Sequence, residues 1–247
     1  MRRILILGGT SEGRALAAAL AEEPDVTVVS SLAGRVRNPR LPVGEVRVGG
    51  FGGVDGLCEY LRDNRIDRVV DATHPFAAQI TANVAVATHL LDIPLLMLRR
   101  PQWEPGTGDR WTPVASLAAA AAALPSLGSR VFLTIGRQGV DAFADADAWF
   151  LVRAIDPPDG RVPPRSTLLL DRGPFNLEDE RELLRGNAIN LLVTKNSGGS
   201  VTEAKLVAAR ELGVRVLMVQ RPPVPAGAAV TADVAAAADW VRVPSRH

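Results

Sequence analysis

The feature that most constrains the fold is a regular alternation of short apolar runs with segments of helical periodicity. The first run, Ile4–Leu7, has no polar position, as expected for a parallel strand that is buried on both faces. Helical spacing then relates four apolar residues that form one helix face: Ala15, Leu16, Ala19 and Leu20. This alternation predicts an α/β fold with mostly parallel sheets covered by helices on both faces.

The same pattern divides the chain into two parts. It predicts strands at Ile4–Leu7, Val26–Ser30, Glu45–Val48, Asp67–Asp71 and Pro94–Leu98, and then at Arg130–Ile135, Trp149–Ala154, Thr167–Asp171, Ile189–Thr194 and Val214–Val219. Helices are expected near residues 11–23, 53–64 and 76–91, and residues 99–113 gather Pro and Gly as a link would. We therefore predict two doubly wound, Rossmann-like domains with a cleft between them, a dinucleotide-binding domain over 1–104 and a substrate domain over 105–247.

Composition narrows the classes of partner. The formal net charge of +1 gives no field that would draw the chain onto nucleic acid or an anionic membrane. No apolar run approaches the roughly 20 residues of a membrane-spanning helix, and the single cysteine, Cys58, fits a reducing compartment. We expect a cytoplasmic protein without a metal site, since its three histidines are far apart in the sequence.

A glycine-rich turn follows the first strand. Gly8, Gly9, Thr10, Ser11 and Gly13 lie in the run GGTSEG, directly before the first helix. Such a turn aims backbone N–H groups and the positive end of the helix dipole at one point, which suits a phosphate. The dinucleotide fingerprint G-x-G-x-x-G is matched at its first and last glycines only, so a turn that merely joins strand to helix stays open as the alternative.

The segment after the second strand bears on the choice of cofactor. NAD enzymes usually place an acid there for the ribose hydroxyls, whereas this chain has Ser30 and Ser31, followed by Arg35 and Arg37. Hydroxyls and a guanidinium would hold a 2′-phosphate, which a carboxylate would repel. The sequence therefore predicts NADPH, with ordinary solvated loop arginines as the alternative.

Six motifs occur in order along essentially the whole chain: GGTSEGR, DATHPFA, GRQG, DRGPF, TKNSGG and TEAK. With them the chain resembles the precorrin-6A reductase family of cobalamin biosynthesis. The resemblance implies two Rossmann-like domains that bind a tetrapyrrole, and NADPH-dependent reduction of one macrocycle double bond of precorrin-6A to give precorrin-6B. It leaves open a cobalt-containing substrate, and it makes neighbouring enzymes of the corrin pathway the protein partners to consider.

The substrate would be a flat macrocycle fringed by carboxylates, so cations and N–H donors at strand ends are its candidate ligands. Arg137 and Arg172 follow two predicted strands, although about half of such arginines are expected to pair with nearby acids. After the strand Ile189–Thr194, the loop TKNSGGS opens a helix as the first turn does. It offers Lys195 as a point charge for a carboxylate or the nicotinamide, and further donors at Asn196, Ser197 and Gly198.

DATHPFA supplies the remaining candidates. Asp71 ends a strand, Thr73 offers a hydroxyl to the cofactor, and His74 could donate the proton that accompanies hydride transfer. Alternatively, His74 only shapes the pocket and Asp71 only caps the next helix. Two rival functions also remain at this point. One is a cofactor-free tetrapyrrole lyase or cyclase, which would not bind NADPH, and the other is a sensor that binds NADP without turnover.

Overall fold

The structure, a computed structural model, describes residues 2–34 and 38–243. Two compact units divide these residues. The first is formed by the chain up to Pro101 together with the chain from Pro222 onward, and the second spans Gln102–Arg221. In the part of the chain that is described, no helix is both long and apolar enough to cross a membrane.

The first unit contains a parallel sheet whose strands lie in the order β12-β5-β4-β1-β2-β3. The strands are β1 (Arg2–Leu7), β2 (Val26–Leu32), β3 (Glu45–Val48), β4 (Arg68–Asp71), β5 (Leu95–Leu98) and β12 (Ala229–Thr231). The chain winds outward from β1 through β2 to β3, and then crosses to β4 on the other side. Ligands of such sheets bind outside the carboxyl ends of the strands at this point of reversal, here between β1 and β4.

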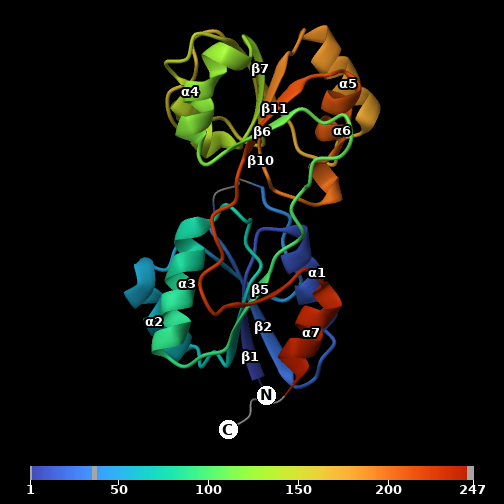
Figure 1. Cartoon of the computed structure of the whole chain (residues 1–247). Helices are drawn as coiled ribbons and strands as arrows, with labels where there is room; N and C mark the ends of the chain where they lie inside the picture. The colour runs from blue at the N-terminus through green and yellow to red at the C-terminus, as the bar shows by residue number, and fades with distance from the viewer. Residues whose placement is uncertain (1, 35–37, 244–247) are drawn as a thin grey trace. The chain divides into compact units, whose positions relative to one another are not determined.

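Helices cover both faces of this sheet (Figure 1). They are α1 (Ser11–Leu20), α2 (Gly53–Asp63), α3 (Ala78–Leu90) and α7 (Val234–Arg242). In β1, Ile4 and Ile6 pack with residues of α1 and α7, while Leu5 and Leu7 pack with residues of α2 and α3. Because successive strand residues point to opposite faces, burial on both sides explains why this run is apolar throughout.

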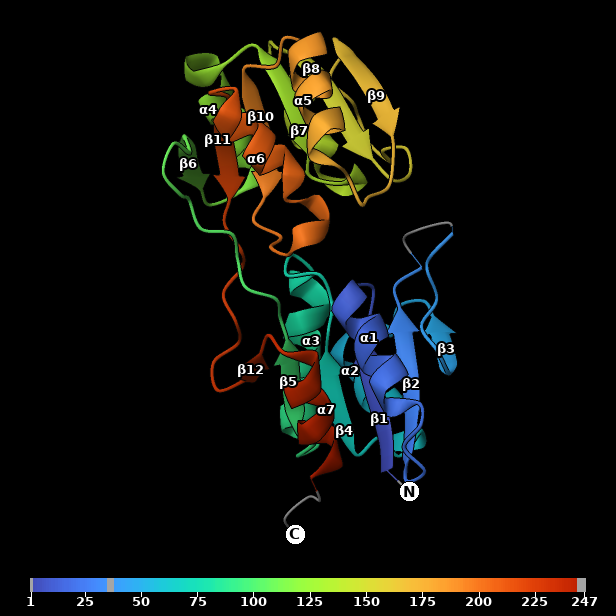
Figure 2. The ribbon, with the colours of Figure 1, turned by 90° about the vertical axis from the view of Figure 1, so that its right-hand side faces the viewer.

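The end of the chain corrects the predicted domain boundary. Residues 222–247 were assigned to the second domain, but β12 pairs with β5 and α7 packs against α1 in the first unit (Figure 2). Val241 of α7 is fully buried, and Arg2 donates to its carbonyl oxygen at 2.7 Å. The physical reason is that β5 would otherwise expose an unpaired edge, and α1 an apolar face.

The second unit has a parallel sheet in the order β6-β11-β10-β7-β8-β9. Its strands are β6 (Trp111–Val114), β7 (Arg130–Thr134), β8 (Trp149–Ala154), β9 (Ser166–Leu170), β10 (Leu191–Lys195) and β11 (Arg215–Val219). Here the winding reverses between β7 and β10. The predicted fold class is confirmed, although β6 begins within the residues expected to be a link. Pro113 made this segment look unlike a strand, and the proline is tolerated because β6 is an edge strand.

Helices also flank the second sheet, with α4 on one side and α5 and α6 on the other (Figure 1). They are α4 (Leu117–Leu127), α5 (Leu177–Gly186) and α6 (Ala204–Glu211), with 3₁₀ turns at η1 (Arg137–Phe143) and η2 (Ser200–Thr202). Phe132, Leu192 and Met218 of three neighbouring strands pack with residues of α5 and α6 in one core. Asn176 caps the start of α5, since its side chain accepts from the N–H of Asp179 at 2.9 Å.

Candidate active site

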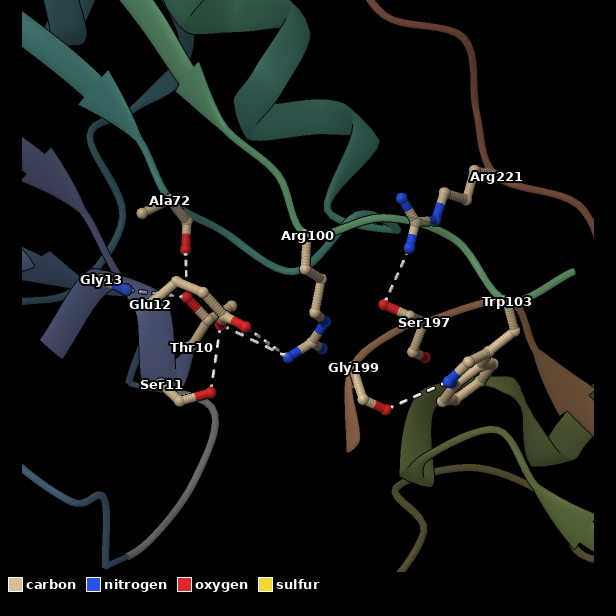
Figure 3. Close-up of polar contacts among 10 residues, drawn as sticks. All are labelled: Thr10, Ser11, Glu12, Gly13, Ala72, Arg100, Trp103, Ser197, Gly199 and Arg221. Carbon is tan, nitrogen blue, oxygen red and sulfur yellow. Dashed lines mark hydrogen bonds and ion pairs between the residues drawn. The ribbon is translucent and has the colours of Figure 1, made fainter. Parts of the chain in front are cut away.

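The turn after β1 has the geometry of an anion-binding turn. Gly9 has a φ of +116°, a conformation that favours glycine, and Thr10 is the N-cap of α1. The Thr10 hydroxyl accepts from the N–H of Gly13 at 3.1 Å and donates to the carbonyl oxygen of Ala72 at 2.7 Å. A Cβ on Gly13 would lie 3.2 Å from that of Ala72. Thr10, which replaces the middle glycine of the fingerprint, therefore ties this turn to the end of β4 (Figure 3).

The serines after the expected second strand lie inside it instead. Because β2 continues to Leu32, Ser30 and Ser31 are strand residues with exposures of 1% and 5%. Among the described atoms, the Ser30 hydroxyl has no hydrogen-bond partner. The strand was expected to end at Ser30, so Ser31 is a strand residue instead of a loop residue, because the strand runs further than its apolar pattern. Arg35 lies outside the described residues.

Arg47 is a cation at this end of the sheet that the sequence analysis missed. It lies on β3, and its guanidinium donates to the carbonyl oxygens of Gly49 and Gly50, both at 2.6 Å. The guanidinium also lies 3.8 Å from the ring centroid of Phe51 and donates to the Ser31 hydroxyl at 3.4 Å. These contacts fix the glycine turn after β3. The run GGFGG follows this strand, and nothing in the sequence of the run indicates that an arginine fixes it.

Asp71 organises the loop after β4. Its buried carboxylate accepts from the N–H and the hydroxyl of Thr73, at 3.0 and 2.6 Å, and from the hydroxyl of Thr81 at 2.7 Å. Such a carboxylate is suited to holding the loop rather than to exchanging protons with a substrate. The structure thus gives Asp71 a role in ordering the loop and the Thr73 hydroxyl a contact with Asp71, while the catalytic role of Asp71 and the cofactor contact of Thr73 stay predictions.

His74 lies half-buried in the same loop. Its Nδ1 accepts from the N–H of Phe76 at 3.3 Å. This contact orients the ring within the loop, and the predicted role of His74 as proton donor stays a prediction.

Lys195 is the last residue of β10, half-buried at the point where the second sheet reverses. Burial lowers the pKa of its ammonium group below the ordinary value of 10.5. The expected exposed loop residue is thus a strand residue, and its ammonium is a stronger acid than that of a solvated lysine.

The loop that follows is fastened by its carbonyl oxygens. Arg221 donates to the carbonyls of Asn196 and Ser197 at 2.7 and 3.0 Å, and the indole N–H of Trp103 donates to that of Gly199 at 3.0 Å (Figure 3). Gly198 and Gly199 have φ values of +67° and +77°. The loop leads into η2, and α6 begins only at residue 204, so the expected repeat of the first turn's strand–turn–helix geometry is wrong.

Asn196 has a structural task in this loop. Its buried carboxamide accepts from the N–H of Trp103 at 2.8 Å and donates to the carbonyl of the same residue at 3.0 Å. A side chain paired in this way with one backbone residue does not offer its donors to a ligand. Its predicted contact with substrate stays a prediction.

Three arginines of the second unit, the predicted Arg137 and Arg172 and also Arg153, have different surroundings. Arg137 forms an ion pair with Asp159 at 2.9 Å, and Arg153 forms a buried pair with Glu180 at 2.6 Å. The Arg153 guanidinium also lies 3.7 Å from the ring centroid of Phe175. Arg172 donates its backbone N–H to the carboxylate of Asp171 at 2.7 Å. Arg153 is therefore part of the core, whereas Arg137 stays at the carboxyl end of β7.

The comparisons with known proteins address the identity of this site. The family model described as "Precorrin-6x reductase CbiJ/CobK" matches residues 3–242. The chain belongs to this family. It is 64% identical to the precorrin-6A reductase of Rhodococcus erythropolis over the full length of both chains. The resemblance seen in the motifs is therefore confirmed, as is the expectation of an oxidoreductase of cobalamin biosynthesis.

A solved structure and a more distant relative complete the comparison. The structure described as "CobK precorrin-6A reductase" is 44% identical, covers 98% of this chain and 96% of that chain, and has a TM-score of 0.90. A cobalt-precorrin-6A reductase of Priestia megaterium is 29% identical over 91% of this chain and 92% of its own. The two sheets are thus the fold of this reductase family.

Proposed function

We propose that the chain reduces one double bond of the precorrin-6A macrocycle with NADPH to give precorrin-6B. The observation that carries the proposal is the 64% identity, over full length, to a protein named precorrin-6A reductase. The lower identity of 29% to a cobalt-precorrin-6A reductase favours the metal-free macrocycle as the preferred substrate.

The first turn fits the cofactor. A Cβ built on Gly9 meets no atom within 4 Å, so the backbone there is open to a ligand, while Gly13 needs its lack of a side chain for packing. We assign the pyrophosphate to Gly8, Gly9, Thr10, Ser11 and Gly13, at the N-terminus of α1. NADPH, when bound, supplies a hydride.

The choice of NADPH over NADH rests on the end of β2. Leu32, Ala33 and Gly34 follow the buried serines there, so no acid stands at the position where NAD enzymes hold the ribose hydroxyls. Arg35 comes next in the sequence and is proposed to bind the 2′-phosphate. A reaction that consumes NADPH belongs in the cytoplasm, where the lone cysteine would remain a thiol.

The second unit is proposed to bind the tetrapyrrole. Arg137 and Arg172 follow strands of its sheet and would pair with carboxylates of the macrocycle. Gly198 lacks a side chain and has a φ of +67°, so we propose that the macrocycle approaches the loop closely at Gly198 and its neighbour Ser197. Neighbouring enzymes of the corrin pathway are the proteins with which such a chain would exchange its substrate and product.

Reduction of a carbon–carbon double bond also requires a proton. We assign the proton to Nζ of Lys195, because burial lowers the pKa of this ammonium group and makes it a better acid than an ordinary lysine. His74 is then a hydrogen-bond donor through Nε2, since its Nδ1 accepts from the backbone.

The direct test is to mix the protein with precorrin-6A and NADPH and to follow the absorbance of the reduced nicotinamide. The proposal predicts that this absorbance falls only when both are present, and that the product gains two hydrogens in mass. Faster turnover of a cobalt-containing substrate would contradict the preference for the metal-free macrocycle. If NADPH is oxidised with neither substrate, the proposed activity itself is wrong.

A further inference from the structure

A guanidinium stands at the end of α1 where helix electrostatics disfavour it. Arg100 follows β5, and its side chain extends to the N-terminus of α1, where Nη1 lies 3.4 Å from both carboxylate oxygens of Glu12 (Figure 3). The helix dipole makes this end positive, so cations are favoured at the opposite end. An anion close to the guanidinium would therefore stabilise Arg100 at this end of the helix.

In this structure the anion is Glu12 itself. Glu12 is the second residue of α1, and its carboxylate accepts from its own backbone N–H and from the Ser11 hydroxyl at 3.1 Å. Burial would raise the pKa of this carboxyl, but the backbone N–H, Arg100 and Ser11 together hold it below its ordinary value. The carboxylate thus stays charged and uses an N–H of the first helical turn, one of the groups that would otherwise bind a phosphate.

The contact between the two side chains is loose. One nitrogen of Arg100 serves both oxygens at 3.4 Å, whereas strong charge-assisted pairs use two parallel bonds of about 2.7–2.9 Å. A pyrophosphate offers more charge and more acceptor oxygens than a carboxylate does. It would therefore compete well for this guanidinium.

We propose that Arg100 is a pyrophosphate-binding residue, and that Glu12 is a stand-in anion that gives way when the cofactor binds. This inference rests on the proposed function, because it assumes that a dinucleotide occupies the first turn. In the free protein Glu12 keeps Arg100 at the helix end. In the complex the two phosphates take over the guanidinium and the N–H groups of the turn.

The test is calorimetric titration of NADP⁺, without substrate, into the intact protein and its variants. Arg100→Ala should weaken binding by about 10–100-fold, the loss expected for a charge-assisted contact, and Arg100→Lys should recover part of it. Glu12→Gln should tighten binding by about 3–10-fold, because it removes the competing charge. The matched control is Arg242→Ala, which removes ion pairs with Glu23 and Asp239 in the same unit and should leave NADP⁺ affinity unchanged.

A second probe separates this contact from recognition of the 2′-phosphate. Adenosine 2′-monophosphate lacks the pyrophosphate, so Arg100→Ala should not alter its affinity. Unchanged NADP⁺ binding by Arg100→Ala, weaker binding by Glu12→Gln, or equal losses for both probes would overturn the proposal. Failure of the unaltered protein to bind NADP⁺ would instead overturn the cofactor assignment. Thermal unfolding of each variant would show that a loss of binding is not a loss of fold.

Discussion

The turn after β1 and the loop after β10 lie at the points of reversal of their two sheets, yet they are fastened in opposite ways. In the first, a side chain within the turn, Thr10, satisfies the N–H of Gly13 and the carbonyl of Ala72, and α1 begins at once. In the second, side chains from outside the loop, Trp103 and Arg221, hold its carbonyl oxygens.

The difference teaches what a glycine-rich strand end can offer. Where the helix begins inside the turn, its N-terminus faces the ligand, and an anion is the natural partner. Where a 3₁₀ turn intervenes before α6, the loop instead presents the strand's last side chain, Lys195, and backbone held by its carbonyls. Similar runs of Gly and polar residues therefore fit the two different tasks that we propose for them, cofactor binding and substrate binding.

The largest effect is expected from a substitution in the first turn, Gly8→Val. A Cβ on Gly8 would lie 3.3 Å from Cδ2 of Leu32, a side chain that can move, so Gly8→Val should fold. The branches of valine would crowd the pyrophosphate, and NADP⁺ affinity should fall by about 100-fold or more, near 2.7 kcal/mol. Titration calorimetry measures this loss, with Gly186→Val as the control, since a Cβ there meets nothing within 4 Å. Retained affinity would remove the first turn from the cofactor site.

The next effect belongs to the second loop. Lys195→Met keeps an apolar stem but removes the charge, so kcat/KM should fall by roughly 10-fold or more, about 1.4 kcal/mol, while NADP⁺ affinity is kept. Steady-state kinetics with precorrin-6A provide the measurement. A variant with normal turnover would show that Lys195 serves neither substrate nor proton.

The pH dependence of stability sharpens the same assignment. The pKa of Lys195 is lower in the folded chain than its ordinary value of 10.5, so burial of the charged form costs stability at all lower pH values. That cost is relieved as pH rises through the folded pKa toward 10.5, because the folded state then binds fewer protons than the unfolded state. Relative to Lys195→Met, the unaltered protein should gain stability over that alkaline window. Parallel curves for the two proteins would contradict the cause assigned to the pKa.

A smaller effect is expected where the loop is tied to residue 103. Asn196→Ala would leave the buried N–H and C=O of Trp103 without their partner, at a cost of about 1–3 kcal/mol of unfolding free energy. Chemical denaturation measures the loss. A stable variant with a selective rise in substrate KM would restore Asn196 as a ligand.

The smallest effect concerns Arg137. Its partner Asp159 is exposed, and such pairs contribute about 0–1 kcal/mol, so Arg137→Ala should leave stability nearly unchanged. If Arg137 meets a substrate carboxylate, KM for precorrin-6A should still rise several-fold. An unchanged KM would leave Arg137 as a surface charge only.

The sequence predicted the fold well because the apolar runs are continuous. Strands such as β1 and β10 are buried on both faces, and their largely apolar sequences indicate this burial directly. The last part of the chain gave no such signal, since β12 is a short edge strand with half-exposed Val230. Its place beside β5 depends on a pairing between residues that are distant in sequence, which local periodicity does not contain.

The candidate site was predicted less completely. Glycines and charges indicated candidate strand ends, but the partners of each side chain depend on the fold. Asp71 accepts from the hydroxyl of Thr81, which lies in the first turn of α3, and Asn196 pairs with Trp103, which is distant in the sequence. The sequence alone did not indicate either contact. Arg47 and Arg100 were missed because the sequence around an arginine does not indicate which distant residue it contacts, and the chain contains many arginines.

The measurement that tests the division of labour most directly is hydrogen–deuterium exchange with and without NADP⁺. The account predicts slower exchange at the backbone amides of residues 9–13 when NADP⁺ is added, because they face the pyrophosphate at the N-terminus of α1. Unchanged exchange there, with slowing confined to residues 196–200, would place the cofactor on the second loop and contradict the account.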